Sequence, residues 1–340
     1  MKRTEKQLSN IKKNLIELVE TEYPRSDEHF IYQDMLFNVE QLREENLDVV
    51  ELRLLNTAFK ELRYALKVFK PYRSVPKAAV FGSARTPKNH ANFKFAESFG
   101  KKLVKKGWMI ITGGASGIME AAMVGAGAKN SFGLNIMLPF EQDANPVIRG
   151  DQKLIFFKYF FTRKLMFLKE SEATVLFPGG FGTFDEGFES FTLVQTGKAK
   201  PRPIVLMDTP GSAFWTTTIQ TLKKNMEREQ LVSPGDFSLM RHFQDADQAV
   251  KELAQFYSNY HSSRFLKDQY LIRLRKPLSK PNFDKLNRDF KGIVTRGGFE
   301  RLTDLTEDDN KDSKLERILF NFDRSNYQRL RALIDYLNSL

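Results

Sequence analysis

The chain of 340 residues contains no cysteine. This absence excludes a disulfide framework, a zinc site built on thiolates and a cysteine nucleophile. The chain also lacks any apolar run approaching the roughly 20 residues that a membrane-spanning helix needs. Its first residues, MKRTEKQLSNIKKNL, are charged and no apolar stretch follows them, so they do not resemble a secretory signal. We therefore expect a cytoplasmic protein that makes no contact with a membrane.

Several ligand-binding patterns are missing as well. After the apolar run AAVFG comes SAR, where a dinucleotide-binding fingerprint would continue with glycines, and the chain has no Gly-Lys-Ser/Thr of a P-loop. The four histidines, His29, His90, His242 and His261, do not have the spacing of metal ligands. No lysine lies in a setting that indicates a Schiff base with pyridoxal phosphate. We expect neither a metal nor a cofactor.

The charge is positive and unevenly distributed. The net charge is +11, and residues 1–74 contribute none of it, with 13 basic and 13 acidic side chains. Residues 75–260 carry 23 basic against 17 acidic side chains, and residues 261–340 carry 17 against 12. A basic surface suits ligands that bear phosphate, although it equally suits a soluble protein without a specific partner.

Three parts can be separated along the chain. Residues 1–74 have apolar residues at helical spacing in NIKKNLIELVETEY and DVVELRLLNTAFKELRYALKVFK, with Pro24 and the pair Ser26-Asp27 between them. Pro71 and Pro76 bracket a linker, after which residues 75–260 form the second part. Residues 261–340 are basic, and we expect them to be mainly helical, with the acidic EDDNKD as a loop before a last helix.

The second part alternates strand and helix patterns. Five short apolar runs are candidate strands: KAAVFG, WMIITGG, FGLNIMLP, ATVLFPGG and RPIVLMD. Helical patterns cover residues 92–106, 154–170, 183–196 and 212–229. Continuous apolar strands separated by helices are typical of a parallel sheet covered on both faces. We predict an α/β fold, a doubly wound parallel sheet with helical N- and C-terminal extensions.

Three turns that follow candidate strands are rich in glycine. They are Gly82–Arg85, Gly113–Gly117 and Pro178–Thr183. In an open parallel sheet all three lie at the carboxyl edge, where ligands bind. Glycine allows a ligand to approach the backbone, and a helix N-terminus favours phosphate, although one such turn alone is more often a simple steric link. Together they predict a phosphate site without a P-loop lysine.

Charged side chains accompany the last of these turns. Glu186 lies one turn into the predicted helix, where a carboxylate is either simply stabilised by the helix dipole or faces a ligand. Asp185 points about 100° away from Glu186 around the helix axis. Upstream, Arg163 and Lys164 stand among apolar residues in FFTRKLMFLK. A basic pair in such a setting favours a cleft over bulk solvent. We interpret Glu186 as a group that stabilises a cationic sugar or activates water, and expect Asp185 to face elsewhere.

These residues together resemble the Lonely Guy family, whose members are often labelled lysine decarboxylases. The segment LFPGGFGTFDE matches the family's PGGxGTxxE motif, and the RK pair precedes it at the family's position. VFGSAR, TGGASGIMEAA and LPFEQDANP are similar to the bacterial branch. The resemblance covers about residues 77–230. One departure is GGASG, where many bacterial relatives have glycine followed by proline, which bears on the shape of the ribose pocket.

The resemblance implies a Rossmann-like fold and a phosphoribohydrolase that cleaves the N-glycosidic bond of an AMP-like nucleoside 5′-monophosphate. By position, Arg163 and Glu186 match the catalytic pair. The residues implied in phosphate binding are Ser83, Gly179, Gly180, Gly182 and Thr183. Those implied in contacts with the nucleotide or ribose are Gly82, Arg85, Gly114, Glu120 and Lys164. The resemblance also implies a homodimer or a larger homo-oligomer.

Two alternatives remain open from the sequence. A binding module on the same fold would hold a nucleotide, a cofactor or single-stranded nucleic acid without cleaving it. The segment 261–300, with 10 basic and 4 acidic residues, and aromatic residues such as Phe265, Tyr270 and Phe283, keeps nucleic acid possible. The second alternative is a scaffold protein in which the flanking helices matter most. The pair Arg163 and Glu186 favours the hydrolase, because a carrier does not need both.

Overall fold

A computed structural model describes residues 13–14, 17, 27–137, 144–233, 235–303, 312 and 314–340 of the chain. It divides into two compact units, Met1–Lys60 and Glu61–Leu340. The first unit contains α2 (Asp27–Glu44) and the start of α3 (Val49–Phe69). Most of the predicted first helix, and most of the predicted EDDNKD loop, lie outside the described residues. Among the described helices, none combines the length and the apolarity that crossing a membrane requires.

The second unit is built on a seven-stranded sheet with the order β4-β3-β2-β1-β5-β6-β7, and every pairing in it is parallel. The strands are β1 (Lys77–Phe81), β2 (Met109–Thr112), β3 (Ser131–Ile136), β4 (Leu154–Phe157), β5 (Ala173–Leu176), β6 (Ile204–Met207) and β7 (Met240–Phe243). The chain winds outward from β1 to β4 and then returns to place β5 beside β1. The direction of winding therefore reverses between β1 and β5, which is where open α/β sheets bind ligands.

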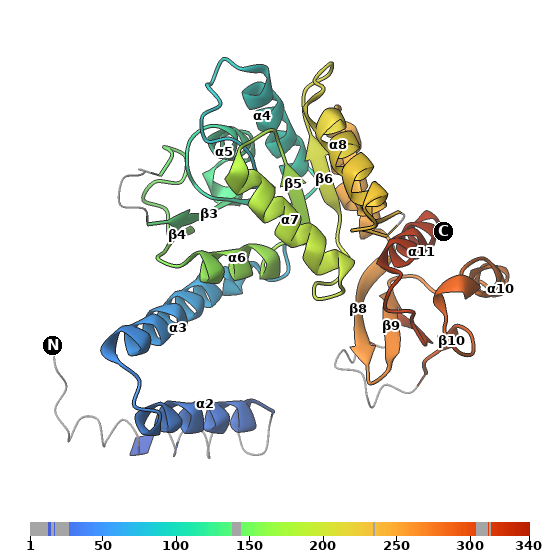
Figure 1. The fold of residues 1–340 in the computed structure, drawn as a ribbon, viewed down its shortest axis with the longest axis horizontal. Coiled ribbons are helices and arrows are strands. Elements are labelled where there is room, and N and C mark those ends of the chain that lie inside the picture. The colour runs from blue at the N-terminus through green and yellow to red at the C-terminus, as the bar shows by residue number, and fades with distance from the viewer. Residues whose placement is uncertain are drawn as a thin grey trace. The chain divides into compact units, whose positions relative to one another are not determined.

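Helices cover both faces of this sheet (Figure 1). They are α4 (Ala91–Val104), α5 (Ile118–Ala126), α6 (Phe160–Lys169), α7 (Phe181–Gln195), α8 (Phe214–Arg228) and α9 (Ala246–Phe256). Successive residues of β1 divide between two cores: Val80 packs with α4, α5 and α9, and Phe81 packs with Phe167 of α6 and Trp215 of α8. This alternation confirms the predicted doubly wound α/β fold.

Two strands differ from the sequence prediction. Residues 154–157 form β4 instead of the start of a helix, because Ile155 and Phe157 are buried in register with β3 and Phe156 is exposed. Strand β7 has no counterpart among the predicted strands. It is a half-buried edge strand with the sequence MRHF, which carries too few apolar residues to be noticed.

The C-terminal part was predicted to be mainly helical, and this prediction is wrong. It contains an antiparallel sheet with the order β10-β11-β9-β8, and two helices. Its elements are β8 (Tyr260–Leu266), β9 (Gln269–Leu274), α10 (Lys280–Asp289), β10 (Glu300–Arg301), β11 (Glu316–Phe320) and α11 (Tyr327–Ser339). A tight turn with Lys267 at φ +53° joins β8 to β9, and Tyr270, Ile272 and Leu274 alternate into the core beneath α11. The predicted last helix is present only from Tyr327.

Short 3₁₀ helices and ion pairs complete the second unit. The 3₁₀ helices are η1 (Lys70–Tyr72), η2 (Ala128–Asn130), η3 (Asp236–Leu239) and η4 (Lys291–Ile293). Arg241 of β7 pairs with Asp335 of α11 at 2.5 Å, and Arg331 of α11 pairs with Glu252 of α9. These pairs fix α11 against the last strand and helix of the large sheet, so ion pairs as well as apolar contacts join the C-terminal part to it.

Candidate active site

The three glycine-rich turns meet at the carboxyl edge of the sheet, next to β1 and β5. The backbone N–H of Ser83 donates to the carbonyl of Pro178 at 3.1 Å, and the N–H of Ile118 donates to the carbonyl of Ser83 at 3.0 Å. The Ser116 hydroxyl donates to the carbonyl of Ala84 at 2.9 Å. The first turn is therefore hydrogen-bonded to both of the others, and the three form one rigid rim.

Glycine is required where these turns touch. A Cβ atom on Gly117 would lie 2.2 Å from the carbonyl oxygen of Ser83, and Gly117 also has φ +67°. A Cβ atom on Gly179 would lie 2.1 Å from Thr183 Oγ1 and 2.9 Å from the backbone nitrogen of Ser83. No side chain fits at either position without displacing a neighbouring turn.

A matched pair of alanine substitutions tests this packing. We expect Gly179→Ala to destabilise the protein by about 1–3 kcal/mol, because the methyl group must displace Thr183 or the Ser83 backbone. Gly180→Ala is the control, since a Cβ atom there has no neighbour within 4 Å. Urea unfolding of both variants measures the difference. Equal free energies of unfolding for the two variants would show that the turns are not packed as described.

The third turn leads into the N-terminus of α7. Gly180 is the N-cap residue with extended backbone angles, and no side chain caps the helix. The N–H of Thr183 bonds to the Gly180 carbonyl at 2.9 Å. The N–H groups that precede Thr183 in the first helical turn of α7 have no partner within the helix, and the helix dipole adds positive potential at this end. This end of α7 suits an anion.

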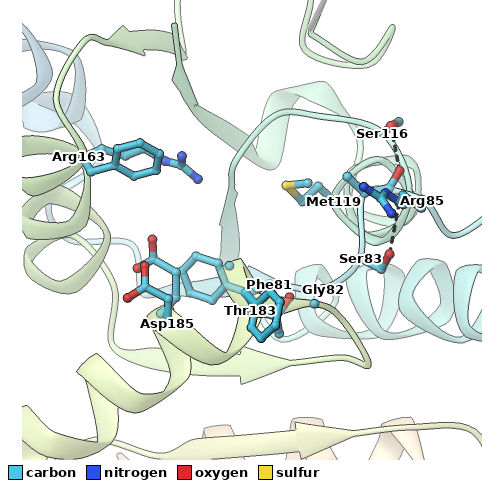
Figure 2. Close-up of a pocket in the computed structure, with 15 residues that line it drawn as sticks. Phe81, Gly82, Ser83, Arg85, Ser116, Met119, Arg163, Thr183 and Asp185 are labelled. Atoms are coloured by element: carbon cyan, nitrogen blue, oxygen red, sulfur yellow. Dashed lines mark hydrogen bonds between the residues drawn. The ribbon is translucent and has the colours of Figure 1, made fainter. Parts of the chain in front are cut away.

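A cavity of about 870 Å³ opens between these elements. It is lined by eight of the residues predicted for the site, namely Gly82, Ser83, Arg85, Arg163, Gly180, Gly182, Thr183 and Glu186. Figure 2 shows Arg163 and Asp185 on one side of it and Ser83, Arg85 and Ser116 on the opposite side. The walls thus combine a helix end that suits an anion, one arginine on each side and two carboxylates.

Arg163 reaches the cavity from α6. Its guanidinium carbon lies 5.4 Å from the centre of the Phe167 ring and 6.0 Å from that of Phe160. Burial lowers the pKa of Arg163, and the charges of Glu186 and Asp185 oppose that effect. The Nε atom is buried without a hydrogen-bond partner among the described residues. Aromatic packing therefore orients the Arg163 cation, and its Nε donor is left unused among the described residues.

Glu186 belongs to the first part of α7 and is only 7% exposed. Burial raises its pKa, whereas the nearby charges of Lys164 and Arg163 lower it. Lys164 Nζ is 3.6 Å from Glu186 Oε2, and it lies closer to Asp185 and Glu189, at 2.9 and 2.8 Å. Burial lowers the pKa of Lys164, but these carboxylates raise it by more. The lysine thus holds the acids of α7 in place.

Four predicted site residues do not line the cavity. Lys164 pairs with the carboxylates of α7, and Gly179 supports the rim through its close packing against Thr183 and Ser83. Glu120 is buried in the first turn of α5, and its Oε1 atom pairs with Lys88 Nζ at 2.7 Å. Gly114 has φ +73° and packs against Leu154, and its carbonyl accepts the N–H of Asn145 at 2.8 Å. Their predicted contacts with a nucleotide remain predictions.

Other cavity residues were not predicted from the sequence. Asp185 lines the cavity, so the expectation that it faces elsewhere is wrong. The cavity extends over the end of α7, where side chains on adjacent faces of the helix both reach it. Ser116 and Met119 belong to the predicted second turn and helix, but only their position in space shows that they contribute. Phe160 and Phe181 add apolar surface, and Phe181 is 95% exposed.

The chain is similar to known proteins in sequence and in structure. The family described as "possible lysine decarboxylase" matches residues 118–253, which confirms the resemblance found in the sequence. No curated protein matches the chain. The protein TM1055 has a similar structure with 20% identity and a TM-score of 0.36, over 53% of this chain and 99% of that one.

Two further solved structures show comparable similarity. The molybdenum cofactor carrier protein from Chlamydomonas reinhardtii is 22% identical, with a TM-score of 0.38, over 53% of this chain and 97% of that one. DNA processing protein A from Helicobacter pylori is 14% identical, with a TM-score of 0.35, over 56% and 83%.

Proposed function

We propose that this protein hydrolyses the N-glycosidic bond of a nucleoside 5′-monophosphate, giving a free base and ribose 5-phosphate. One observation carries the proposal: Arg163 and Glu186, from separate helices, line one cavity together with the N-terminus of α7. A binding site for a phosphate needs only the helix end. The addition of a buried carboxylate and an aromatic-packed guanidinium matches the charges that this bond cleavage develops.

The phosphate end of the substrate is assigned to the rim. The unpaired N–H groups of α7, the hydroxyl groups of Ser83 and Thr183, and the cation of Arg85 surround that part of the cavity. Anchoring a dianion there supplies binding energy at a distance from the bond that breaks, and it aligns the sugar for reaction. This arrangement favours nucleoside monophosphates over nucleosides.

The reacting end is assigned to Glu186 and Arg163. When the bond from C1′ to the base nitrogen breaks, its electron pair goes to the base, and the sugar becomes cationic. The Glu186 carboxylate stabilises that cation and accepts a proton from the water whose oxygen bonds to C1′. Arg163 stabilises the negative charge on the departing base, which takes up a proton as it is released. Burial strengthens both effects, because little solvent screens them.

A substrate panel tests the proposal. The protein is incubated with AMP, GMP, CMP and UMP, and free base is measured by chromatography. We expect release of base from at least one monophosphate, and at least 100-fold slower release from the matching nucleoside, which lacks the phosphate. Absence of free base with every monophosphate would refute the hydrolase and leave binding without cleavage as the function of this cavity.

A further inference from the structure

A second cavity of about 430 Å³ lies at the amino edge of the large sheet, opposite the candidate active site. It is bounded by the end of α6, by the residues that lead into β5 and β6, and by the start of β8. Lys169, Lys200, Arg202 and His261 contribute its cationic and imidazole groups. The active-site proposal makes no use of any of them.

Arg202 is the unusual member of this set. The residue is only 6% exposed, and the hydrogen bonds that its guanidinium donates among the described residues go to a carbonyl and a hydroxyl group, not to a carboxylate. Nη1 donates to the carbonyl of Leu168 at 2.9 Å and Nη2 donates to the Ser171 hydroxyl at 2.6 Å. The Nε atom is buried without a partner among the described residues. Burial lowers the pKa of Arg202, and the charge of Glu172 offsets only part of that effect.

The neighbouring carboxylates are already engaged. Glu172 accepts the backbone N–H of Lys77 at 2.6 Å, and its charge is shared between the buried Lys77 and Arg202. Glu170 pairs with Lys169 at 2.6 Å. Among the described residues, the charge of Glu172 is therefore shared by two buried cations, and the exposed Lys200 adds a further positive charge at the rim. Among the described residues that line the cavity, the cations Lys169, Lys200 and Arg202 outnumber the one carboxylate, Glu172.

The surroundings of His261 reflect the same surplus. Burial lowers its pKa first, and the positive charges of Arg275, Arg273 and Lys200 lower it further, against the opposing charge of Asp312. The rings of Tyr257 and Tyr260 close the cavity on the side of the C-terminal part. A cavity of this size with cationic donors and aromatic walls is suited to a small anion with a compact organic group.

We propose that this second cavity binds a small phosphate-bearing anion. The charge-assisted donors of Arg202 and Lys200 match phosphate oxygens, and a bound dianion would compensate the buried guanidinium. The site is distinct from the first cavity, because Arg163 and Lys169 stand six residues apart on α6, about 9 Å along the helix axis. An anion here would contact the helix that carries Arg163 at its other end.

Titration calorimetry with inorganic phosphate, pyrophosphate and ribose 5-phosphate tests the proposal. The background is Gly180→Asp, which places a carboxylate at the anion-binding end of α7 and so removes the first cavity as a phosphate site. In that background we compare Lys200→Glu with Lys198→Glu. Both lysines are exposed on one loop, but only Lys200 lines the second cavity. These variants are preferred to Arg202 variants, because Arg202 also holds the end of α6.

We expect saturable binding of at least one of the three probes, near one equivalent, in the Gly180→Asp protein and in its Lys198→Glu form. Lys200→Glu should weaken that binding at least tenfold. Preference for ribose 5-phosphate over inorganic phosphate would indicate an organic phosphate as the natural ligand, and the reverse order would indicate free phosphate. No saturable binding, or binding that Lys200→Glu leaves unchanged, would overturn the proposal. Either result is independent of whether the protein hydrolyses nucleotides.

Discussion

Replacing Glu186 with glutamine is expected to lower the rate of base release at least 1000-fold, which corresponds to about 4 kcal/mol of transition-state stabilisation. The amide keeps the size of the side chain in its buried position, so the cavity retains its shape. It carries no charge to stabilise a cationic sugar and cannot accept a proton from water. Single-turnover measurements with a monophosphate substrate separate this loss from any change in binding.

The neighbouring acids of α7 provide the matched controls. Asp185→Asn and Glu189→Gln each remove one carboxylate that contacts Lys164, as Glu186→Gln does. Glu189 does not line the first cavity, so its variant should retain nearly full activity. Asp185 lines the cavity at an exposed position, and its variant should lose less than tenfold. If Glu189→Gln were as inactive as Glu186→Gln, the catalytic role of Glu186 would be refuted. Both losses of activity would then come from the removal of a carboxylate that neutralises Lys164.

The substitution Glu186→Gln is also expected to make the folded protein more stable at neutral pH. Burial raises the pKa of Glu186 in the folded state above its value in the unfolded chain, so the folded state binds the proton more tightly. The stability contributed by that proton is complete at low pH, below the ordinary pKa of about 4.3, and is lost as the pH rises through the folded-state pKa. A glutamine has no such loss.

Thermal unfolding across pH measures this effect. Above the folded-state pKa of Glu186, we expect the melting temperature of Glu186→Gln to exceed that of the wild type by about 1–3 °C. The difference should close as the pH falls below about 4.3. A variant that is less stable than the wild type at pH 7 would mean that the attraction of Lys164 and Arg163 outweighs the cost of burying the carboxylate.

The sequence predicts the central part of the fold because each local signal there has one physical meaning. KAAVF and ATVL are continuously apolar, since parallel strands are buried on both faces, and both are central strands of the sheet. The signal fails at the edges. MRHF in β7 is half-buried and mixed in character, and in LIFFKYFF the same aromatic residues suit a strand and a helix equally well.

The residues of the candidate site also fall into those that the sequence predicts and those that it does not. The glycine-rich turns and Glu186 can be predicted from the residues, since a turn after a central strand must lie at the ligand-binding edge. Arg163 cannot be placed by that reasoning, because its approach depends on how α6 packs beside Phe167, and the role proposed for it comes from the family resemblance. Asp185 was misplaced because helical spacing gives directions around an axis but not the extent of a cavity that covers the end of the helix.

Gly180→Asp is expected to abolish activity without weakening the fold. Gly180 has φ −86° and ψ −160°, an extended conformation that suits an aspartate N-cap, and a Cβ atom there meets nothing within 4 Å. The new carboxylate can accept the free N–H groups of the first turn of α7, which stabilises the helix by a few tenths of a kcal/mol relative to glycine. Those N–H groups are the ones assigned to the substrate phosphate.

We therefore expect kcat/KM to fall at least 1000-fold while the melting temperature stays equal or rises slightly, since the aspartate both occupies the anion site and repels a phosphate dianion. Gly180→Asn is the control with the same shape: it caps the helix but carries no charge, so it should lose activity by a smaller factor. The gap between the two variants should narrow as salt increases, because salt screens the repulsion between charges near the protein surface. If both variants retained full activity, the end of α7 would not be the phosphate site, and the orientation proposed for the substrate would be wrong.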